Sequence, residues 1–347
     1  MRASTPPDRS RPVAIWLFVV AALVLTMVIV GGATRLTGSG LSITEWRPVT
    51  GTLPPLNEAQ WIEEFEKYRM IPQYQEVNRG MSMEAFQFIY WWEWGHRFLG
   101  RLVGLAFAVP FAIFLFRRQI PQRLVGRCWG LFALGGLQGL IGWWMVASGL
   151  SERVSVAPER LMTHLGLAFF LLAALLWTGL EAWNGPSRRA ARGPWPLAAL
   201  GLAVMVYLQI LLGALVAGND AGYVLTDWPL MGGQWFPDGY AGPGVWATIA
   251  HSIPAVQFNH RVGAYLLCAG ALALLVASLR SRRAAPALRR MGVFLSLGVF
   301  GQAALGIWTL TSATPLSLGL AHQAAAAVLL GLATAFLWMA RRSTWVS

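Results

Sequence analysis

Four histidines lie inside long apolar segments of the sequence: His96, His164, His260 and His322. Ionisable side chains are costly in a bilayer and tend to mark function, so four at similar depths are difficult to explain as packing. Two facing imidazoles supply both axial ligands of a haem iron. A bare metal ion needs a third or fourth protein ligand, and no cysteine or carboxylate cluster provides one in both halves. The pattern predicts two bis-histidine haem sites, one in each half.

Small residues follow each histidine by four positions, on the same face of a helix. They leave a flat surface on which a porphyrin ring can lie, although small residues also favour close packing of membrane helices. The four positions are Gly100, Ala168, Ala264 and Ala326.

A carboxylate accompanies only one of the predicted sites. Glu93 lies three residues before His96, whereas Gln257 occupies the matching position before His260. A carboxylate beside a haem acts as a base or stabilises developing positive charge, and a glutamine cannot act as a base. The asymmetry predicts that the first site performs chemistry and the second only holds a haem. The alternative is that Glu93 simply pairs with Arg97, one helical turn away.

Arginines follow two of the histidines. Arg97 and Arg261 come directly after His96 and His260, and Arg101 lies one turn beyond Arg97. We expect these residues to pair with haem propionates. Extension of the side chains to lipid headgroups is the alternative.

Composition indicates that these residues are positioned by membrane helices. Of 347 residues, 56% are hydrophobic and only 12% are charged, against about 25% charged in a soluble domain. Runs of about 20 apolar residues are long enough to cross a bilayer. We predict eight spans, at 13–33, 87–116, 128–148, 159–183, 195–217, 256–279, 291–312 and 317–340.

Arginines concentrate in the predicted connections on one side of the membrane, which explains the net charge of +12 without nucleic acid. Most acidic residues fall on the opposite side, so the positive-inside rule places both termini in the cytoplasm. The arginines on the inner side include Arg2, Arg9, Arg11, Arg117, Arg118, Arg123, Arg127, Arg188, Arg189, Arg192, Arg280, Arg282, Arg283, Arg289, Arg290, Arg341 and Arg342.

The sequence contains one four-span unit twice. "GSGLSITEWRP" corresponds to "DAGYVLTDWP", "GHRFLGRLVG" to "NHRVGAYLL", and "LQGLIGWWMVASG" to "GQAALGIWTLTSA". Because four is an even number of spans, both copies have the same orientation. We predict an all-α integral membrane protein of two tandem, pseudo-twofold-related four-helix bundles, residues 1–184 and 185–347, joined by a linker at 184–196.

Two outer segments are long, 34–86 and 218–255. Within the first, Asn57 and Gln60 resemble a capping box, and Trp61, Phe65 and Tyr68 recur at helical spacing. We expect an amphipathic helix here, either on the membrane surface or as a solvated connector.

Several long strings of the sequence resemble the heme A synthase family, which oxidises the C8 methyl of haem O to the formyl of haem A for cytochrome oxidase assembly. They are "GGATRLTGSGLSITEWRPVTGTLPPL", "YWWEWGHRFLGR", "FNHR" and "AHQ". The resemblance covers almost the whole chain and implies the same eight-span, two-bundle fold. Some bacterial members carry an outer cysteine pair, whereas Cys128 and Cys268 lie within predicted spans.

The resemblance implies a role for each site. Haem O would bind as substrate between His96 and His164, beside a catalytic Glu93. Haem b would bind as a cofactor between His260 and His322. We expect a multi-pass protein of the bacterial inner membrane, with its haem sites near the periplasmic side. Its partners would be lipid, a haem O-supplying enzyme, cytochrome oxidase assembly factors and an unidentified electron acceptor, with no nucleic acid. A homo-oligomer is left open.

Two other functions are compatible with parts of the pattern. A non-enzymatic dihaem cytochrome b explains the four histidines but not the difference between Glu93 and Gln257. A haem or solute transporter explains the repeat but not the matched histidine pairs.

Overall fold

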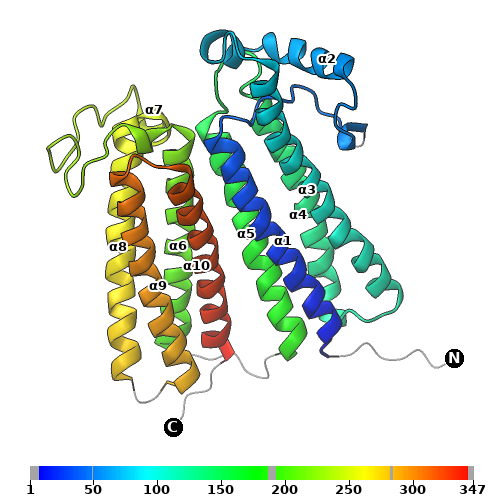
Figure 1. The fold of residues 1–347 in the computed structure, drawn as a ribbon. Coiled ribbons are helices and arrows are strands. Elements are labelled where there is room, and N and C mark those ends of the chain that lie inside the picture. Colours follow the sequence, from blue (N-terminus) through cyan, green and yellow to red (C-terminus); the bar gives the residue numbers. More distant parts are fainter. Residues whose placement is uncertain (1–7, 49, 187–192, 282–283, 343–347) are drawn as a thin grey trace.

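The computed structural model describes residues 8–48, 50–186, 193–281 and 284–342, and its main body consists of long helices (Figure 1). Eight of these helices are long and apolar enough to cross a membrane, which confirms the predicted number of spans. Several begin earlier than predicted, because their polar first turns continue the helix beyond the apolar run. The eight are α1 (Arg11–Leu36), α3 (Met83–Phe116), α4 (Gln122–Ala147), α5 (Pro158–Asn184), α6 (Pro194–Gly218), α8 (Ile253–Arg280), α9 (Pro286–Thr311) and α10 (Leu316–Arg342).

Local sequence signals set where several helices begin. Pro158, Pro194 and Pro286 occupy the first positions of α5, α6 and α9, where the missing N–H of proline costs no helical hydrogen bond. Ser82 and Ser252 precede α3 and α8, and their hydroxyls accept hydrogen bonds from Ala85 and Ala255.

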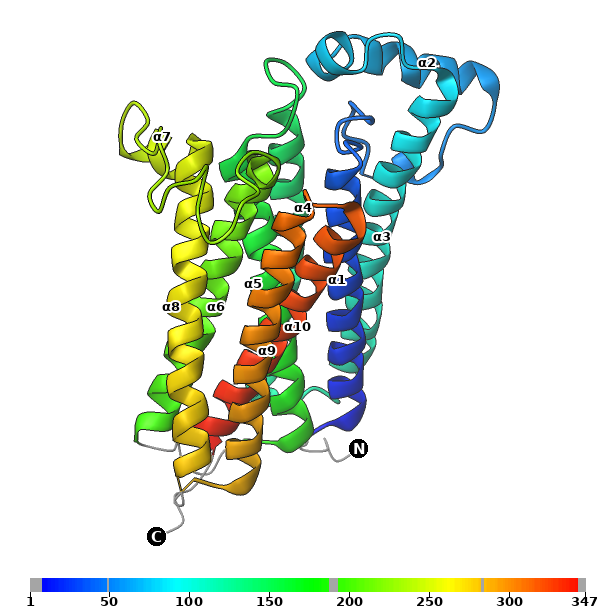
Figure 2. The same cartoon turned by 60° about the vertical axis from the view of Figure 1, so that its left-hand side comes forward.

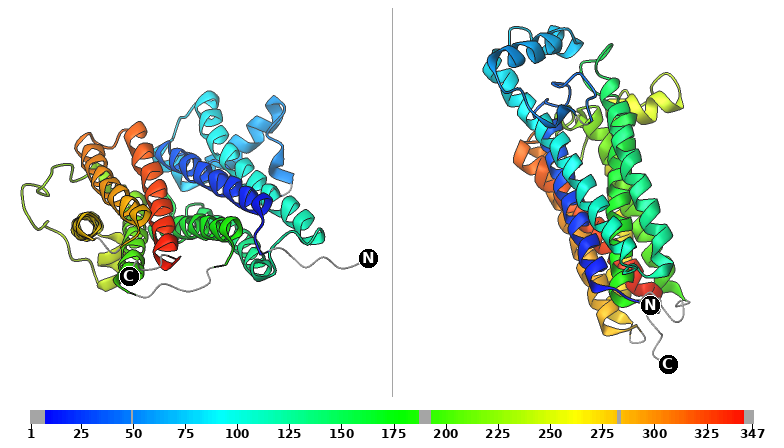
Figure 3. Two further views of the ribbon diagram at one scale, coloured as in Figure 1. Left: turned by 90° about the horizontal axis from the view of Figure 1, so that it is seen from below. Right: turned by 90° about the vertical axis from the view of Figure 1, so that its right-hand side faces the viewer.

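The long helices pack in two groups, seen end-on in Figure 3. In the first group, α1 packs against α3 and α5, and α4 packs against α5. In the second, α6 packs against α8 and α10, and α9 lies between α8 and α10. The groups meet where α10 contacts α1 and α5, and where α5 contacts α6. The pseudo-twofold relation between them stays a prediction, and most of the predicted linker, 187–192, lies outside the described residues.

Small residues allow the helices to approach closely. A Cβ on Gly179 of α5 would lie 2.5 Å from the ring of Phe18 on α1. Polar contacts also join the groups: for example, Gln323 donates to the carbonyl of Val28 at 2.7 Å, and Tyr207 donates to the carbonyl of Gly166 at 3.1 Å. Interhelical hydrogen bonds of this kind stabilise helix association in a bilayer.

Large apolar side chains remain exposed on helices of both groups, including Leu105, Val109, Leu197, Leu272 and Phe294. Figure 2 shows the course of the helices that carry them, α3, α6, α8 and α9. Exposure on this scale is typical of a surface that faces lipid. Helix α1 begins and helix α10 ends at the same end of the molecule, opposite α2 (Glu58–Arg69) and α7 (Val245–His251) (Figure 1).

Helix α2 is the amphipathic helix predicted from the sequence. The side chain of Asn57 accepts from the backbone N–H of Gln60, and Gln60 accepts from Leu56, which confirms the capping interaction. Its aromatic face packs on the first turns of α3, with Phe65 stacked on Phe86 at 4.7 Å between ring centroids. The aromatic face of α2 is therefore anchored on α3, and the choice between a membrane-surface helix and a connector stays a prediction.

Candidate functional site

The four predicted histidines lie on α3, α5, α8 and α10, each nearer the beginning of its helix than the end. His96 and His164 lie on helices of the first group, and His260 and His322 lie on helices of the second, so each predicted pair belongs to one group. Each histidine is partly buried. This arrangement brings together the residues predicted to form each site.

A glycine on the neighbouring helix lies against every one of the histidine rings. A Cβ added at Gly31 would lie 3.0 Å from Nε2 of His96, and one at Gly213 would lie 3.1 Å from Cε1 of His260. The same relation joins Gly142 to His164 and Gly306 to His322, both at 2.8 Å. Any larger residue would displace the ring, so these glycines preserve the space that the imidazoles occupy.

Three of the histidines contact a glutamine that the sequence analysis missed. The amide nitrogens of Gln138, Gln209 and Gln302 lie 3.2, 3.0 and 3.1 Å from Nδ1 of His164, His260 and His322, respectively. Each amide also donates to the backbone carbonyl of the same histidine, at 2.8–3.0 Å. The glutamine thus holds both the ring and the backbone of the residue.

The sequence carries a signal for these contacts. Each glutamine precedes its glycine by four positions, in "QGLIG", "QILLG" and "QAALG". That spacing places the amide and the gap for the ring on one helix face. The fourth string is "MVIVG", in which Met27 replaces glutamine before Gly31. In the part of the chain that the structure describes, no side-chain amide hydrogen-bonds to the ring of His96.

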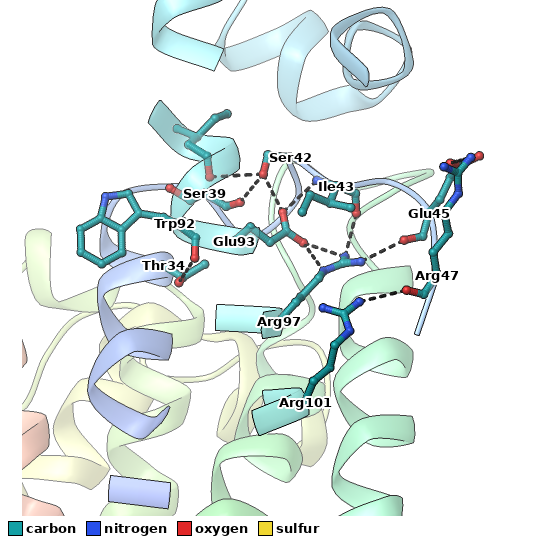
Figure 4. A network of polar contacts seen from close by, with 11 residues as sticks. Thr34, Ser39, Ser42, Ile43, Glu45, Arg47, Trp92, Glu93, Arg97 and Arg101 are labelled. Carbon is teal, nitrogen blue, oxygen red and sulfur yellow. Dashed lines mark hydrogen bonds and ion pairs between the residues drawn. The ribbon is translucent and has the colours of Figure 1, made fainter. Parts of the chain in front are cut away.

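Glu93 is almost completely buried, at 2% exposure, and its carboxylate accepts hydrogen bonds from Arg97, Ser42 and Ile43 (Figure 4). Its Oε1 accepts from Nε and Nη2 of Arg97, at 3.0 and 2.7 Å. Its Oε2 accepts from the hydroxyl of Ser42 at 2.7 Å and from the backbone N–H of Ile43 at 2.9 Å. The ion pair considered as an alternative to catalysis is therefore formed. This ion pair gives Glu93 a structural role, and the catalytic role of Glu93 stays a prediction.

Arg97 and Arg261 hold corresponding segments in the two halves. Arg97 donates to the carbonyls of Ile43 and Glu45, at 2.8 and 2.9 Å. Arg261 donates to the carbonyls of Leu225, Asp227 and Leu230, at 2.9, 3.0 and 2.8 Å. In the repeat, Glu45 corresponds to Asp227 and Ile43 to Leu225. Each arginine therefore fixes the segment that follows the first helix of its unit.

Gln257 takes the place of Glu93 in the second group and reproduces only part of its contacts. Its side-chain oxygen accepts from Arg261 at 3.0 Å, while its nitrogen donates to the carbonyl of Ala221 at 2.7 Å. The position accepts a hydrogen bond from arginine in both halves. Only the first half buries a carboxylate there.

Arg101 lies one turn further along α3 and has spare hydrogen-bonding capacity. Its Nε and Nη2 donate to the carbonyls of Pro48 and Arg47, both at 2.9 Å. Its Nη1 is buried without a partner among the described residues. Arg101 and Arg97 line an outer pocket of about 270 Å³ together with Glu45, Gln60 and Tyr90.

The residues fit a haem better than a bare metal ion. No group of three or more histidine, cysteine or acidic side chains that could hold a metal occurs among the described residues. Each group of helices instead carries two of the predicted histidines, which is the number of axial positions of a haem iron. The flanking glycines, the small residues one turn along and the unpartnered Nη1 of Arg101 are further features that a porphyrin with propionates would use.

The fold is that of a multi-pass membrane protein with a histidine on each of four of its long helices. The family described as cytochrome oxidase assembly protein matches residues 14–334. A heme A synthase of Caulobacter vibrioides is 60% identical over 335 residues, which covers 96% of this chain and 98% of the relative. Those of Caulobacter sp. strain K31 and Parvibaculum lavamentivorans are 59% and 52% identical, covering 96% and 92% of this chain and 98% and 92% of the relatives. The chain belongs to this cytochrome oxidase assembly family, as its sequence resemblance predicted.

Proposed function

We propose that this protein is an enzyme of haem A biosynthesis, a heme A synthase that oxidises the C8 methyl group of haem O to a formyl group. The observation that carries the proposal is the asymmetry between two otherwise matched histidine pairs. Both pairs have glycine-backed rings, but only the pair of His96 and His164 has a buried carboxylate nearby. Relatives with up to 60% identity carry the name heme A synthase.

In this proposal His96 and His164 bind haem O as substrate, and His260 and His322 bind haem b as a resident cofactor. In each of two successive steps the methyl carbon would lose two electrons and gain one oxygen from a water molecule, with release of two protons, giving a hydroxymethyl group and then an aldehyde hydrate that loses water. A haem b held by His260 and His322 would supply a route for the electrons to an external acceptor. The chain itself would orient the substrate through the imidazoles of His96 and His164.

Glu93 would act as a fixed charge. Oxidation of a methyl conjugated to the porphyrin leaves positive charge, which a nearby carboxylate stabilises. Both oxygens of Glu93 already accept two hydrogen bonds each, from Arg97 and from Ser42 and Ile43. This arrangement favours electrostatic stabilisation over proton abstraction, because no acceptor position is left for a water molecule.

The arginines predicted to pair with propionates divide into two kinds. Arg97 and Arg261 use most of their N–H groups on backbone carbonyls and on Glu93 or Gln257. We assign them chiefly to holding the outer segments. Arg101 retains an unpartnered Nη1, and Arg261 retains an unpartnered Nε. Because Arg101 donates only two hydrogen bonds within the described residues, it is the best supported partner for a propionate.

We place the protein in the bacterial inner membrane, with both termini in the cytoplasm and the haem sites near the periplasmic side. Arg11, Arg123 and Arg342 lie at the end where α1 begins and α10 ends, as the positive-inside rule requires of a cytoplasmic end. Lipid, a haem O-supplying enzyme and oxidase assembly factors follow as partners.

Pigment extraction tests the proposed function. The full-length protein is purified from cells that supply haem O, and its haems are separated by chromatography. Haem O or haem A together with haem b supports the synthase. Haem b alone would support a dihaem cytochrome b instead.

A further inference from the structure

The strongest remaining asymmetry lies beside the histidine rings. Gln138, Gln209 and Gln302 contact three of them, and Met27 occupies the corresponding position before Gly31 at the fourth. A Cβ on Gly100, one turn beyond His96, would lie 3.3 Å from the methyl of Met27. Met27 therefore lies on the side of His96 where the other histidines have an amide.

The amide oxygens indicate what the glutamines would do when iron is bound. Oε1 of Gln138, Gln209 and Gln302 is buried without a partner among the described residues. Iron bound at Nε2 leaves the imidazole proton on Nδ1, which then needs an acceptor. The amide nitrogen lies 3.0–3.2 Å from Nδ1, so rotation of the amide about its last side-chain bond would present Oε1 to that proton. The rotation would exchange the hydrogen bond that the amide now donates to the backbone carbonyl of the histidine for one that it accepts from Nδ1.

A hydrogen bond from Nδ1 to an acceptor fixes the ring and makes the imidazole a stronger ligand. Methionine offers only a weak sulfur acceptor, so His96 lacks this support. The difference matches the demands of the proposed reaction, in which one haem enters and leaves while the other stays bound.

We propose that Gln138, Gln209 and Gln302 are positioning residues that strengthen the iron–histidine bonds of His164, His260 and His322, and that Met27 leaves His96 as the ligand that releases iron during substrate exchange. The second part rests on the proposed function, because it takes the haem of the first half to be the substrate. The first part concerns any haem that these histidines bind.

Exchanging the two residue types between sites tests the proposal. The full-length variants Met27→Gln and Gln209→Met are purified with their haems and mixed with excess apomyoglobin, which captures released haem. Chromatography then separates haem O from haem b. Loss of a residue that supports a metal ligand typically weakens binding about 10- to 100-fold. We expect Gln209→Met to accelerate loss of haem b by about that factor, and Met27→Gln to slow loss of haem O similarly.

The reduction potential of haem b provides a readout that a purely structural role would not change. A stronger imidazole ligand favours ferric iron, so Gln209→Met should raise the potential above that of the wild type. Gln209→Glu retains an acceptor and should keep the potential at or below the wild-type value. A wild-type potential in Gln209→Met, or wild-type rates of haem loss in both exchanges, would overturn the proposal. If the wild-type protein bound no haem O, the proposed function would fail, while the potential of haem b would still decide the role of Gln209.

Discussion

Oε1 of Glu93 accepts two hydrogen bonds from Arg97, 3.0 Å from Nε and 2.7 Å from Nη2, in a site where Glu93 is 2% exposed. The equivalent Gln257 accepts a single bond from Arg261, at 3.0 Å. In both halves an arginine one turn later donates to the side chain at this position. Only in the first half does that side chain carry a negative charge. The charge and the hydrogen bonds of Glu93 can be separated by substitution.

Replacing Glu93 by glutamine removes the charge and keeps the size of the side chain. One amide oxygen cannot accept from both Arg97 and the Ser42–Ile43 segment, so some local stability is lost. We still expect insertion and haem b binding, while haem A formation falls about 10²- to 10³-fold. The amount of haem A in haem extracts of the variant measures this loss.

The control Ser42→Ala removes one of the hydrogen bonds to Oε2 of Glu93 and keeps the carboxylate, so it should lower the yield of haem A by less than about tenfold. Near-normal haem A in Glu93→Gln would rule out the catalytic role.

The ligands of the second site are tested by His260→Ala and His322→Ala. Each substitution removes one axial imidazole, so haem b content should fall and its low-spin spectrum should be lost. His251→Ala is a matched control, because His251 lies at the end of α7, 3.6 Å from Glu159 and away from both pairs. Full haem b in both ligand variants would contradict the assignment.

The topology prediction concerns the segments that carry α2 and α7. Reporter fusions at Gly51 and Gly239 should score as periplasmic, and a fusion at Gln119, between α3 and α4, should score as cytoplasmic. A cytoplasmic result at Gly51 and Gly239 would reverse the orientation and place the haem sites near the opposite face.

The loop held by Arg261 should respond to acid. The backbone N–H groups of Gly233 and Gly232 donate to the carboxylate of Asp227, which lowers the pKa of Asp227 below its ordinary value. Because the folded pKa is the lower one, the stabilisation is complete above the unfolded pKa and is lost as pH falls through the folded pKa. Hydrogen exchange at Gly232 and Gly233, corrected for intrinsic rates, should therefore show protection at about pH 6 that is lost in strongly acidic solution, once the pH has fallen through the lowered pKa of Asp227. Asp227→Asn should weaken that dependence, and equal protection at both pH values in the wild type would contradict it.

Long-range apolar patterning made the spans, the helix beginning after Asn57 and the alignment of the histidines predictable from sequence. The positions of Arg97 and Arg261 were also predictable, but their contacts with loop carbonyls were not, because those depend on how the outer segments return over α3 and α8. The contacts of Gln138, Gln209 and Gln302 had a signal in the four-residue spacing to glycine. Recognising it required knowing which helix packs beside each histidine.

The central claim is that the first site converts haem O and the second holds haem b. Its most direct test is to express the full-length protein with a source of haem O and to identify the extracted haems by chromatography and mass. The account predicts haem b together with haem A, and replacement of that haem A by haem O or its alcohol in Glu93→Gln. Haem b as the sole pigment in a wild-type protein that was supplied with haem O would contradict it.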